Sequence, residues 1–586
     1  MSSTTLAEDS STGSAALEES SGRRGWLWIH LASLAVGVVV LLYANRNQWF
    51  WYDEWDFIAR RGLHDPQWSL WRSHNGHWST LPILAYRTLL YFFGVRTYWP
   101  FIGLLVVLHL LLAHVLWRVM LRVGVTPFVA TGLAAVFIVL GSGNANIVWA
   151  FQIGFVGSMV LGWLMVLSAC TVRWNPWRLV GTWVLGVAAL MCSGTGTTMV
   201  ALATFAALAE RGWRRALAVT SVPAVVFLAW YIPIGRLQAA HPSPRTTPKF
   251  VGLGLARSFS TVFGSHSELV GTVVLATIVV VVLVRLREQP RRTALAALAL
   301  ANAFLFFVIA GIGRSALGTN TTSTRYVYEA IALGLPAIGL TLDTIPRLVG
   351  RIRPSSRGVA AAGLVVVGAL VLWMGVTNVD QLRHGVRLQA SGSTHLRQQL
   401  DATVTMMNSG QASFPDAQTA QGSPYLSVEQ MARMVRAGWF PPPKPVDRVL
   451  SLRQRAALQV AVNPKRLPSA AFAPRTGQLT GAGVTPTGSC RLVTPTGGAR
   501  PLILLPAGAT ASFTVTPRAS GTLRVTVSDP GKPATQAPAP LYRLGGGRKY
   551  RVVTLPTDLD VRVYLPAGTP STVCGLALAP PVRSST

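Results

Sequence analysis

The residues best suited to chemistry lie in a segment that mixes aromatic and acidic side chains. It reads WFWYDEWDF at 49–57 and contains Asp53, Glu54 and Asp56. Asp53 and Asp56 are three positions apart, so on a helical turn they share one face. Crowded carboxylates can act as a general base or bind a divalent cation. An interfacial belt of aromatic residues would explain the tryptophans but not the acids.

Two histidines follow in the sequence HNGHW at 74–78. His74 and His77 could meet on one face of a helix, although Gly76 between them weakens a helix. Two histidines are a poor metal site, because zinc normally takes three or four protein ligands. We therefore interpret them as the polar lining of a substrate cleft. Ordinary loop structure is the alternative.

Amide and aromatic side chains cluster further along, where Asn144, Trp149 and Gln152 precede an apolar run. Amides and an indole ring suit the hydroxyls and the ring faces of a sugar. The same residue types also cap helices, so helix capping is an equally good interpretation.

The last polar patch contains Arg314, Arg325 and Tyr326. A guanidinium can hold a phosphate through paired N–H donors, and Tyr326 could add a hydroxyl. An arginine whose charged end reaches to the membrane surface is the alternative for Arg325. Glu329 lies near the start of the same predicted helix, where an acid is favourable without any further role.

Composition indicates which class of protein carries these patches. The chain has 586 residues, of which 50% are hydrophobic and only 12% are charged. Soluble proteins have about 25% charged residues, so the composition argues against a soluble enzyme. It also argues against disorder, which needs low hydrophobicity. A net charge of +31 would suggest nucleic acid in a soluble protein, but basic loops of membrane proteins have another explanation. We expect no nucleic-acid partner.

Apolar runs are the elements that must position the polar patches. Runs near the roughly 20 residues that cross a bilayer predict spans at 26–43, 98–117, 126–141, 151–171, 216–234, 269–286, 293–312, 326–346 and 358–377. The stretch 179–209 is too long for one span, and the sequence SGTG at 193–196 breaks it into two short helices. The total is eleven predicted spans.

Arginines in the connections set the orientation of these spans. They fall in every second connection, at Arg118/Arg122, Arg173/Arg178, Arg211/Arg214/Arg215, Arg285/Arg287/Arg291/Arg292 and Arg347/Arg351/Arg353/Arg357. The positive-inside rule places them in the cytoplasm with the N-terminus, and the C-terminus outside. The pattern requires that 80–95, which contains Pro82 and Arg87, lies at the outer interface as a helix without spanning. All four polar patches then fall on the outer face, which predicts one composite cleft for a partly lipid, partly polar substrate.

The predicted fold is therefore a polytopic α-helical membrane protein with a C-terminal extracytoplasmic α+β region that ends in a β-sandwich. Its parts are a disordered cytoplasmic tail at 1–22, a transmembrane domain at 23–377 with an outer loop at 45–97, a helical and linker region at 378–480, and a β-sandwich at 481–586. Alternating runs between turn residues predict the sandwich, with strands at 511–516, 521–527, 550–555 and 559–565.

The four cysteines divide between two environments. Cys490 and Cys574 flank the predicted sandwich, and we expect them to pair because an outer compartment permits disulfides. Cys170 and Cys192 lie in predicted membrane helices, where cysteine is usually a buried apolar residue.

The motifs WYDEWD (51–56), HNGHWSTLP (74–82), NANIVWAFQIG (144–154) and STRYVYEA (323–330) resemble a bacterial branch of the GT-C class of integral membrane glycosyltransferases. That class includes the protein O-mannosyltransferases and the aminoarabinose transferases. The resemblance covers roughly residues 25–350. The C-terminal β-rich part is similar in placement to the extracytoplasmic domains of several GT-C enzymes.

The resemblance implies an inverting transfer of a sugar from a polyprenyl-phosphate donor to an envelope glycan, lipid or protein at the outer face of the plasma membrane. Asp53 would be the general base or would position the acceptor, and Glu54 and Asp56 would support it or hold a divalent cation. Arg325 with Tyr326 would bind the donor phosphate. The O-mannosyltransferases have a His-Pro-Pro element where His74 and His77 flank Asn-Gly here, so the acceptor stays open.

Two other classes of function compete with a transferase. A transporter or flippase of envelope precursors tends to show repeated halves and charges at mid-membrane, and the sequence shows no clear repeat. A non-catalytic envelope scaffold with a glycan-binding C-terminal module is the other alternative.

Overall fold

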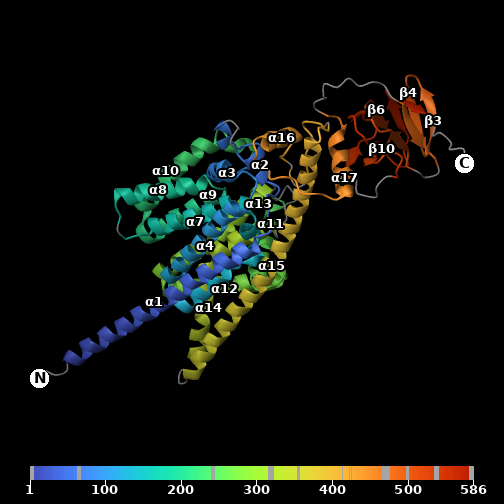
Figure 1. Cartoon of the computed structure of the whole chain (residues 1–586). Helices are drawn as coiled ribbons and strands as arrows, with labels where there is room; N and C mark the ends of the chain where they lie inside the picture. The colour runs from blue at the N-terminus through green and yellow to red at the C-terminus, as the bar shows by residue number, and fades with distance from the viewer. Residues whose placement is uncertain are drawn as a thin grey trace. The chain divides into compact units, whose positions relative to one another are not determined.

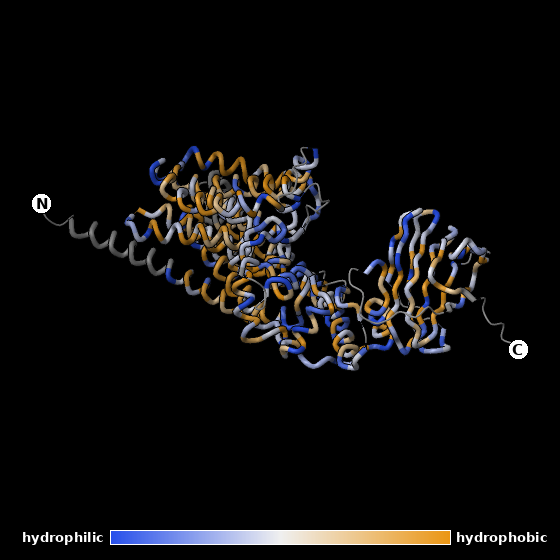
Figure 2. The backbone as a smooth tube through the Cα atoms, turned by 90° about the horizontal axis from the view of Figure 1, so that it is seen from above, coloured by the Kyte–Doolittle hydropathy of each residue, from blue (hydrophilic) through white to orange (hydrophobic). Residues whose placement is uncertain are grey.

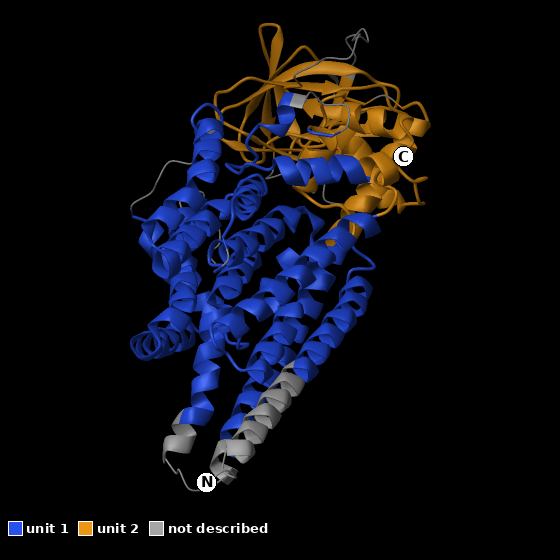
Figure 3. Cartoon of the chain, turned by 90° about the vertical axis from the view of Figure 1, so that its left-hand side faces the viewer, with its two compact units in different colours: residues 1–48, 61–89, 98–391 blue, residues 49–60, 90–97, 392–586 orange. Residues whose placement is uncertain are grey.

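The computed structural model describes residues 5–62, 67–172, 174–238, 245–314, 323–352, 357–411, 413–420, 423, 425–464, 476–496, 500–533 and 540–579. Arg173 and Arg353, and the first four residues of the expected tail, lie outside these ranges. The chain divides into two compact units (Figure 3). Unit 1 comprises residues 1–48, 61–89 and 98–391, and unit 2 comprises residues 49–60, 90–97 and 392–586.

Unit 1 consists of helices (Figure 1). They are α1 (Thr5–Ala44), α3 (Thr80–Phe93), α4 (Trp99–Arg122), α5 (Pro127–Ile138), α6 (Ala145–Val148), α7 (Ile153–Ala169), α8 (Pro176–Leu190), α9 (Thr195–Arg211), α10 (Trp213–Tyr231), α11 (Thr247–Thr261), α12 (Glu268–Glu288), α13 (Pro290–Arg314), α14 (Thr324–Ile352) and α15 (Arg357–Asn408). Short 3₁₀ turns connect them: η1 (Gln67–Leu70), η2 (Gly141–Gly143), η3 (Ala150–Gln152) and η4 (Gly235–Gln238). Helices α3 and α15 end in unit 2.

Each apolar run that predicts a span coincides with one of these helices. Within the described residues, seven are long and apolar enough to cross a membrane: Arg24–Ala44, Trp99–Arg122, Ala150–Ala169, Glu268–Glu288, Pro290–Arg314, Thr324–Arg347 and Ala361–Asn408. Helices α3, α5 and α8 are apolar but shorter. In Figure 2 the hydrophobic colour predominates along the helices, while the β-rich part alternates between the two colours. This is the pattern of a multi-pass membrane protein with a C-terminal β-rich region.

The expected break in the stretch 179–209 is present. Helix α8 ends at Leu190 and α9 begins at Thr195, with the sequence SGTG at the junction. Gly196 allows the two helices to meet, because a Cβ there would lie 2.4 Å from the carbonyl oxygen of Ala189. Gly162 of α7 likewise lies against Met199 of α9, where a Cβ would be 2.4 Å from the Met199 Cβ. Small residues permit such close helix packing in membranes.

Unit 2 contains three short helices and all of the described strands. The helices are α2 (Glu54–Ala59), α16 (Val428–Arg436) and α17 (Arg448–Gln459). The strands are β1 (Val460–Val462), β2 (Thr476–Thr480), β3 (Ala482–Thr487), β4 (Cys490–Pro495), β5 (Leu502–Leu505), β6 (Ala511–Pro517), β7 (Gly521–Ser528), β8 (Leu541–Leu544), β9 (Tyr550–Thr554), β10 (Asp560–Tyr564), β11 (Ser571–Cys574) and β12 (Ala577–Ala579).

The strands form two six-stranded sheets with the orders β1-β9-β6-β11-β4-β3 and β12-β2-β5-β10-β7-β8. Burial alternates along β6, as expected where one face of a strand is buried. Phe513 from the first sheet and Val525 and Val561 from the second belong to one core. The two sheets therefore pack as a β-sandwich. The four strands expected from the sequence match β6, β7, β9 and β10.

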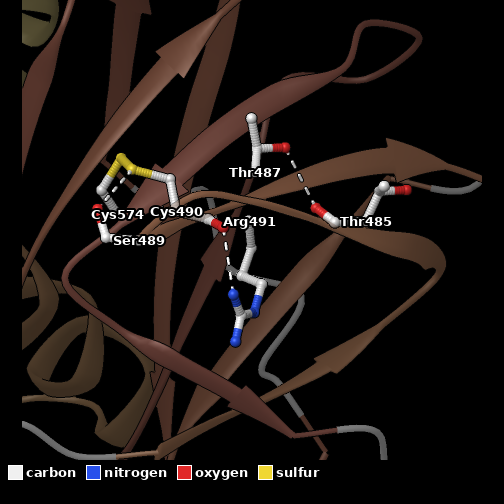
Figure 4. The surroundings of a disulfide bond; sticks show 6 residues. All are labelled: Thr485, Thr487, Ser489, Cys490, Arg491 and Cys574. Carbon is white, nitrogen blue, oxygen red and sulfur yellow. Dashed lines mark hydrogen bonds between the residues drawn. A yellow bond between two sulfur atoms is a disulfide. The ribbon is translucent and has the colours of Figure 1, made fainter.

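A disulfide joins Cys490 to Cys574, as the sequence led us to expect. The two residues are directly opposed in the antiparallel pair β4–β11, and their Cα atoms are 4.3 Å apart. In Figure 4 the Arg491 guanidinium donates a hydrogen bond to the carbonyl oxygen of Cys490 beside the bridge. Cys170 and Cys192 are free and buried, as expected.

Removing this bridge is expected to destabilise the sandwich. The cysteines are separated by 84 residues, and opening a loop of this size restores conformational entropy to the unfolded chain. We expect the Cys490→Ala/Cys574→Ala double variant to lose about 2–4 kcal/mol of unfolding free energy. Thermal unfolding of the full chain measures the loss. With reductant, the unfolding free energy of the wild type should equal that of the double variant. Reductant should not change the unfolding free energy of the double variant. Equal stability of both proteins without reductant would contradict the prediction.

Candidate functional site

A cavity of about 750 Å³ in unit 1 collects residues from segments that are far apart in the sequence. This volume falls within the roughly 300–1,000 Å³ of typical small-molecule sites. Four residues predicted from the sequence line it: His77, Arg314, Arg325 and Tyr326. The other predicted residues of unit 1, which are His74, Asn144, Trp149 and Gln152, are not part of its lining.

The two histidines are placed by a tight turn and not by a helix. The backbone N–H and carbonyl groups of His74 and His77 exchange two hydrogen bonds of 2.9 Å. Asn75 and Gly76 between them have positive φ angles of 50° and 83°. Asn-Gly is the favoured pair for a two-residue hairpin turn of this handedness. The turn directs His77 to the cavity, while His74 packs edge-on against Phe151 with ring centroids 5.4 Å apart.

Each ring nitrogen of His77 has a hydrogen-bond donor beside it. The Gly194 backbone N–H lies 3.1 Å from Nδ1 of His77, and a neutral imidazole accepts a hydrogen bond at only one of its two nitrogens. Burial, and next the Arg314 charge, lower the pKa of His77 to about 3, so the imidazole is neutral at pH 7. Nη2 of Arg314 lies 3.2 Å from Nε2. One of these two donors therefore faces an N–H group of the ring, an arrangement that an acceptor such as an anion would relieve.

Both cavity arginines lie at helix ends. Arg314 is the last residue of α13 and also donates to the carbonyl oxygen of Asn75 over 2.7 Å. Arg325 is the second residue of α14, and its guanidinium lies 5.4 Å from the centre of the Tyr326 ring. Among the described residues, no carboxylate forms an ion pair with either arginine. The cavity therefore carries two guanidinium groups without a direct ion pair in those residues, while the Glu329 carboxyl group interacts with Arg325 electrostatically.

The remaining walls are aromatic and aliphatic. Trp78 stacks on Trp230 with ring centroids 5.0 Å apart and planes 5° from parallel. The Tyr326 ring is buried among three phenylalanine rings, including that of Phe306, at centroid distances of 5.9–6.5 Å. Ile309 and Ile312 of α13 complete the apolar side. Such walls suit a ligand that is both apolar and anionic.

Thr195 was not among the residues predicted from the sequence, and Glu329 was given no role there beyond a favourable acid near a helix start. Thr195, the first residue of α9, lines the cavity, and its hydroxyl donates to the carboxylate of Glu329 at 2.9 Å from each oxygen. Glu329 lies in α14 and is fully buried. An acid near a helix start is favourable by itself, so nothing in the sequence indicates that Glu329 pairs with Thr195. The glycine pair around Thr195 was a usable signal, because it marked a helix start inside an apolar stretch.

The predicted amide and aromatic segment packs next to the histidine turn. The rings of Trp149 and Phe151 stack 5.2 Å apart, and Phe151 contacts His74. Asn144 donates to the carbonyl oxygen of Gly141 over 2.9 Å, which favours a local structural role. The Gln152 side chain is fully buried, and neither of its polar atoms has a hydrogen-bond partner within the described structure.

Three acidic residues lie together in unit 2. Asp53 precedes α2, and Glu54 and Asp56 lie in its first turn. All three are buried, with exposed fractions of 7%, 0% and 4%. Glu54 accepts a hydrogen bond from the Trp51 backbone N–H over 2.6 Å, so it shapes the local backbone. Burial of three carboxylates is costly and indicates a role beyond solubility.

Residues from the C-terminal part hold this acidic segment within unit 2. The Tyr425 hydroxyl donates to Oδ1 of Asp53 over 3.3 Å. Burial, and then Asp53, raise the pKa of Tyr425 to about 12, so the hydroxyl keeps its proton. Gln430 donates to the Ala59 carbonyl oxygen over 3.0 Å. Trp55 stacks on Phe440 with ring centroids 6.2 Å apart. Helix α16 lies within the expected helical and linker region at 378–480 and starts with a capping box formed by Ser427 and Gln430.

The described residues contain no group of three or more His, Cys, Asp or Glu side chains that could hold a metal ion. Asp53, Glu54 and Asp56 therefore do not converge as a three-ligand set. A cation held by fewer protein ligands plus water and substrate oxygens, as magnesium often is, would still fit the donor types.

No protein-family model matches the chain, and no curated protein matches it. Among solved structures the chain is similar to the crystal structure of ArnT from Cupriavidus metallidurans bound to undecaprenyl phosphate. The similarity has a TM-score of 0.42 and 16% sequence identity, and it covers 75% of this chain and 92% of that chain.

Proposed function

We propose that the chain is a membrane glycosyltransferase that moves a sugar from a polyprenyl-phosphate donor to a hydroxyl of an envelope glycan, lipid or protein. The observation that carries the proposal is the cavity of unit 1. It combines Arg314, Arg325 and the imidazole of His77 with aromatic and aliphatic walls. A lipid phosphate that bears a sugar needs positive charge for its phosphate, apolar walls for its lipid chain and polar groups for its sugar.

Placement of the arginines supports a phosphate at the membrane surface. Helix α13 ends at Arg314 and α14 begins at Thr324, and both are long and apolar enough to cross a bilayer. Consecutive spans joined by a short connection turn back at one face, so both arginines lie at that face. Phosphate is favoured there by guanidinium groups and by the N-terminus of α14.

In the proposed reaction, the acceptor oxygen attacks the anomeric carbon of the sugar. The bond between this carbon and the phosphate oxygen breaks with inversion, and the polyprenyl phosphate leaves with the electron pair. Arg314 and Arg325 stabilise the charge that develops on the phosphate. Asp53 takes the proton of the acceptor hydroxyl. Glu54 and Asp56 support Asp53. If a divalent cation is used, Asp53 and Asp56 would hold it, and it would supply Lewis-acid polarisation of the acceptor hydroxyl.

The finer topology belongs to the same proposal. Eleven crossings would place the N-terminus in the cytoplasm, the C-terminus outside, and the ends of α13 and α14 near the cavity at the outer face. Reporter fusions after residues 44, 314 and 586 would test this order. A cytoplasmic signal from the C-terminal fusion would overturn it.

A binding and transfer assay tests the function. The purified full chain in lipid nanodiscs is titrated with undecaprenol, undecaprenyl phosphate and a panel of undecaprenyl-phosphate sugars, and then incubated with envelope extract. We expect phosphate-dependent binding and release of undecaprenyl phosphate from one of the sugar donors. Equal binding of undecaprenol and undecaprenyl phosphate would overturn the proposal. Tight donor binding without transfer to any acceptor would favour a flippase.

Gly194 offers a focused test of the cavity geometry. A Cβ at residue 194 would lie 2.6 Å from Nδ1 of His77, so Gly194→Ala must displace the imidazole. We expect binding of undecaprenyl phosphate to weaken about 5- to 10-fold, as for the loss of one hydrogen bond. Gly181→Ala in α8 is the matched control, because a Cβ there meets nothing within 4 Å. Unchanged binding by Gly194→Ala would show that His77 does not contact the ligand.

A further inference from the structure

We propose that one end of the β-sandwich binds a negatively charged glycan, that is, a sugar polymer that carries carboxylate or phosphate groups. Four exposed basic residues lie at this end: Arg500, Arg518, Arg548 and Lys549. We call the surface formed by these four residues the basic end. The inference concerns unit 2, whereas the cavity lies in unit 1, and it does not depend on the proposed reaction.

Three of the four residues lie in two loops that are hydrogen-bonded to each other. Arg518 follows β6, and Arg548 and Lys549 lie between β8 and β9. The Gly547 backbone N–H donates to the carbonyl oxygen of the residue before Arg518 over 2.7 Å. A Cβ on Gly546 would lie 3.0 Å from the Arg518 carbonyl oxygen, so glycine permits this close approach of the two loops. The backbone therefore holds the three cations near one another.

Arg500 reaches the same end through the loop that follows β10. Arg500 precedes β5, and the next residue, Pro501, accepts a hydrogen bond from the Leu565 backbone N–H over 2.9 Å. The same loop ends at Pro570, whose carbonyl oxygen accepts a hydrogen bond from the Arg518 backbone N–H over 3.0 Å. One loop thus connects the surroundings of Arg500 to those of Arg518.

The acidic residues of the sandwich lie at its opposite end. Asp529 follows β7, Asp558 precedes β10, and Asp560 is the first residue of β10. In the antiparallel pair of β7 and β10, β7 ends and β10 begins at this end. Helix α17 covers it, because Arg448 pairs with Asp529 and Arg455 pairs with Asp558. Asp560 accepts hydrogen bonds from two backbone N–H groups. All three carboxylates are therefore occupied, far along the strands from the basic end.

This separation of charge exceeds what solubility requires. Residues 476–579 contain ten lysines and arginines and only three acids. A surface that serves solubility intersperses the two signs, and clustered like charges repel one another. In the part of the chain that the structure describes, no residue of the basic end forms an ion pair. An anionic partner can therefore bind there without displacing a protein carboxylate.

The other residues of these loops favour a glycan over other polyanions. Besides the four basic residues, positions 500–501, 518–520, 545–549 and 566–570 contain only Gly, Ala, Ser, Thr and Pro. Stable binding to a membrane surface also needs apolar side chains, single-stranded nucleic acid needs aromatic rings for stacking, and protein interfaces have an apolar core.

Ser520 adds a hydroxyl to the basic end. The residue is exposed, and its hydroxyl oxygen accepts the Gly546 backbone N–H over 3.2 Å. A hydroxyl that accepts one hydrogen bond still has its own proton to donate. Guanidinium, ammonium and hydroxyl donors without apolar neighbours suit a partner that is rich in charged and neutral oxygens.

A binding assay with matched polymers tests the inference. The full chain in nanodiscs of zwitterionic lipid is titrated with dextran, phosphorylated dextran and polygalacturonate. We expect at least one charged polymer to bind, dextran not to bind, and added salt to weaken binding because it screens exposed charges. The polymer that binds more tightly identifies phosphate or carboxylate as the preferred group. Arg518→Gln/Arg548→Gln/Lys549→Gln should weaken its binding about tenfold, as for three exposed charge pairs.

A second triple variant, Arg436→Gln/Lys444→Gln/Lys532→Gln, is the matched control. It removes the same charge from exposed positions of unit 2 outside the basic end and should bind the charged polymer with wild-type affinity. The inference is overturned if both charged polymers bind no better than dextran, if salt leaves binding by the wild type unchanged, or if the two triple variants weaken binding equally. Tighter binding of polyglutamate or of anionic lipid vesicles than of both charged polymers would also overturn it, and would assign the basic end to an acidic protein or to a membrane.

Discussion

Replacing Asp53 with asparagine is expected to lower the rate of sugar transfer by about 10²–10⁴-fold, the usual contribution of a general base. Asparagine has nearly the same shape, so the buried position and the hydrogen bond from Tyr425 can persist. It cannot take the proton of an acceptor hydroxyl. Single-turnover transfer from the preferred donor measures the effect, and nanodisc titration of the same donor should show unchanged affinity.

A matched substitution exists in the same unit. Asp447 is exposed and accepts a hydrogen bond from the Leu450 backbone N–H at the start of α17. An asparagine at this position would still cap that helix, so Asp447→Asn should retain full activity. If Asp53→Asn inserts normally and transfers at the wild-type rate, Asp53 is not the base. A parallel loss of donor affinity would instead give this residue a role in binding.

The second large effect is expected from the two cavity arginines. Each hydrogen bond to a charged group contributes about 1.5–3 kcal/mol, so Arg314→Gln/Arg325→Gln should weaken binding of undecaprenyl phosphate by at least about 10²-fold. Binding of undecaprenol, which has no phosphate, should change little. Arg325→Lys should recover only part of the loss, because lysine keeps the charge and loses the paired geometry.

Arg236→Gln provides the control for a general change in charge. Arg236 is exposed in η4 and is not part of the cavity lining, although its neighbour Gly235 is. The Arg236→Gln variant should bind undecaprenol and undecaprenyl phosphate with wild-type affinity. Phosphate selectivity that survives in the double arginine variant would place the phosphate elsewhere in the protein.

Helices were the most predictable part of the fold, because their signal is local. Long apolar runs dictate helices that satisfy their own backbone in lipid, and the glycines at 194 and 196 mark the break between α8 and α9. What length and composition cannot decide is whether a short helix such as α5, with 12 residues, crosses the membrane. Helix α11 lay in an expected outer loop and has too little apolar character to be predicted as a span.

The candidate site could be predicted only for residues whose type and place in the sequence are informative by themselves. Arg314, Arg325 and His77 were identified by type and placement, and all three line the cavity. The partner of Glu329 is 134 residues away in the chain, and only packing of α9 beside α14 reveals it. The location of all four polar patches at the outer face stays a prediction.

Unit 2 is assembled from three separate stretches of chain, and this limits which segments of such a protein can be exchanged by recombination. Residues 49–60 pack with residues after 392 through the contacts of Asp53 with Tyr425 and of Trp55 with Phe440. A recombination event near residue 391 would join an acidic loop from one lineage to supporting residues from another. We expect such hybrids to fail even when both parents are active. The C-terminal part should therefore evolve together with residues 49–60, and not as an exchangeable cassette.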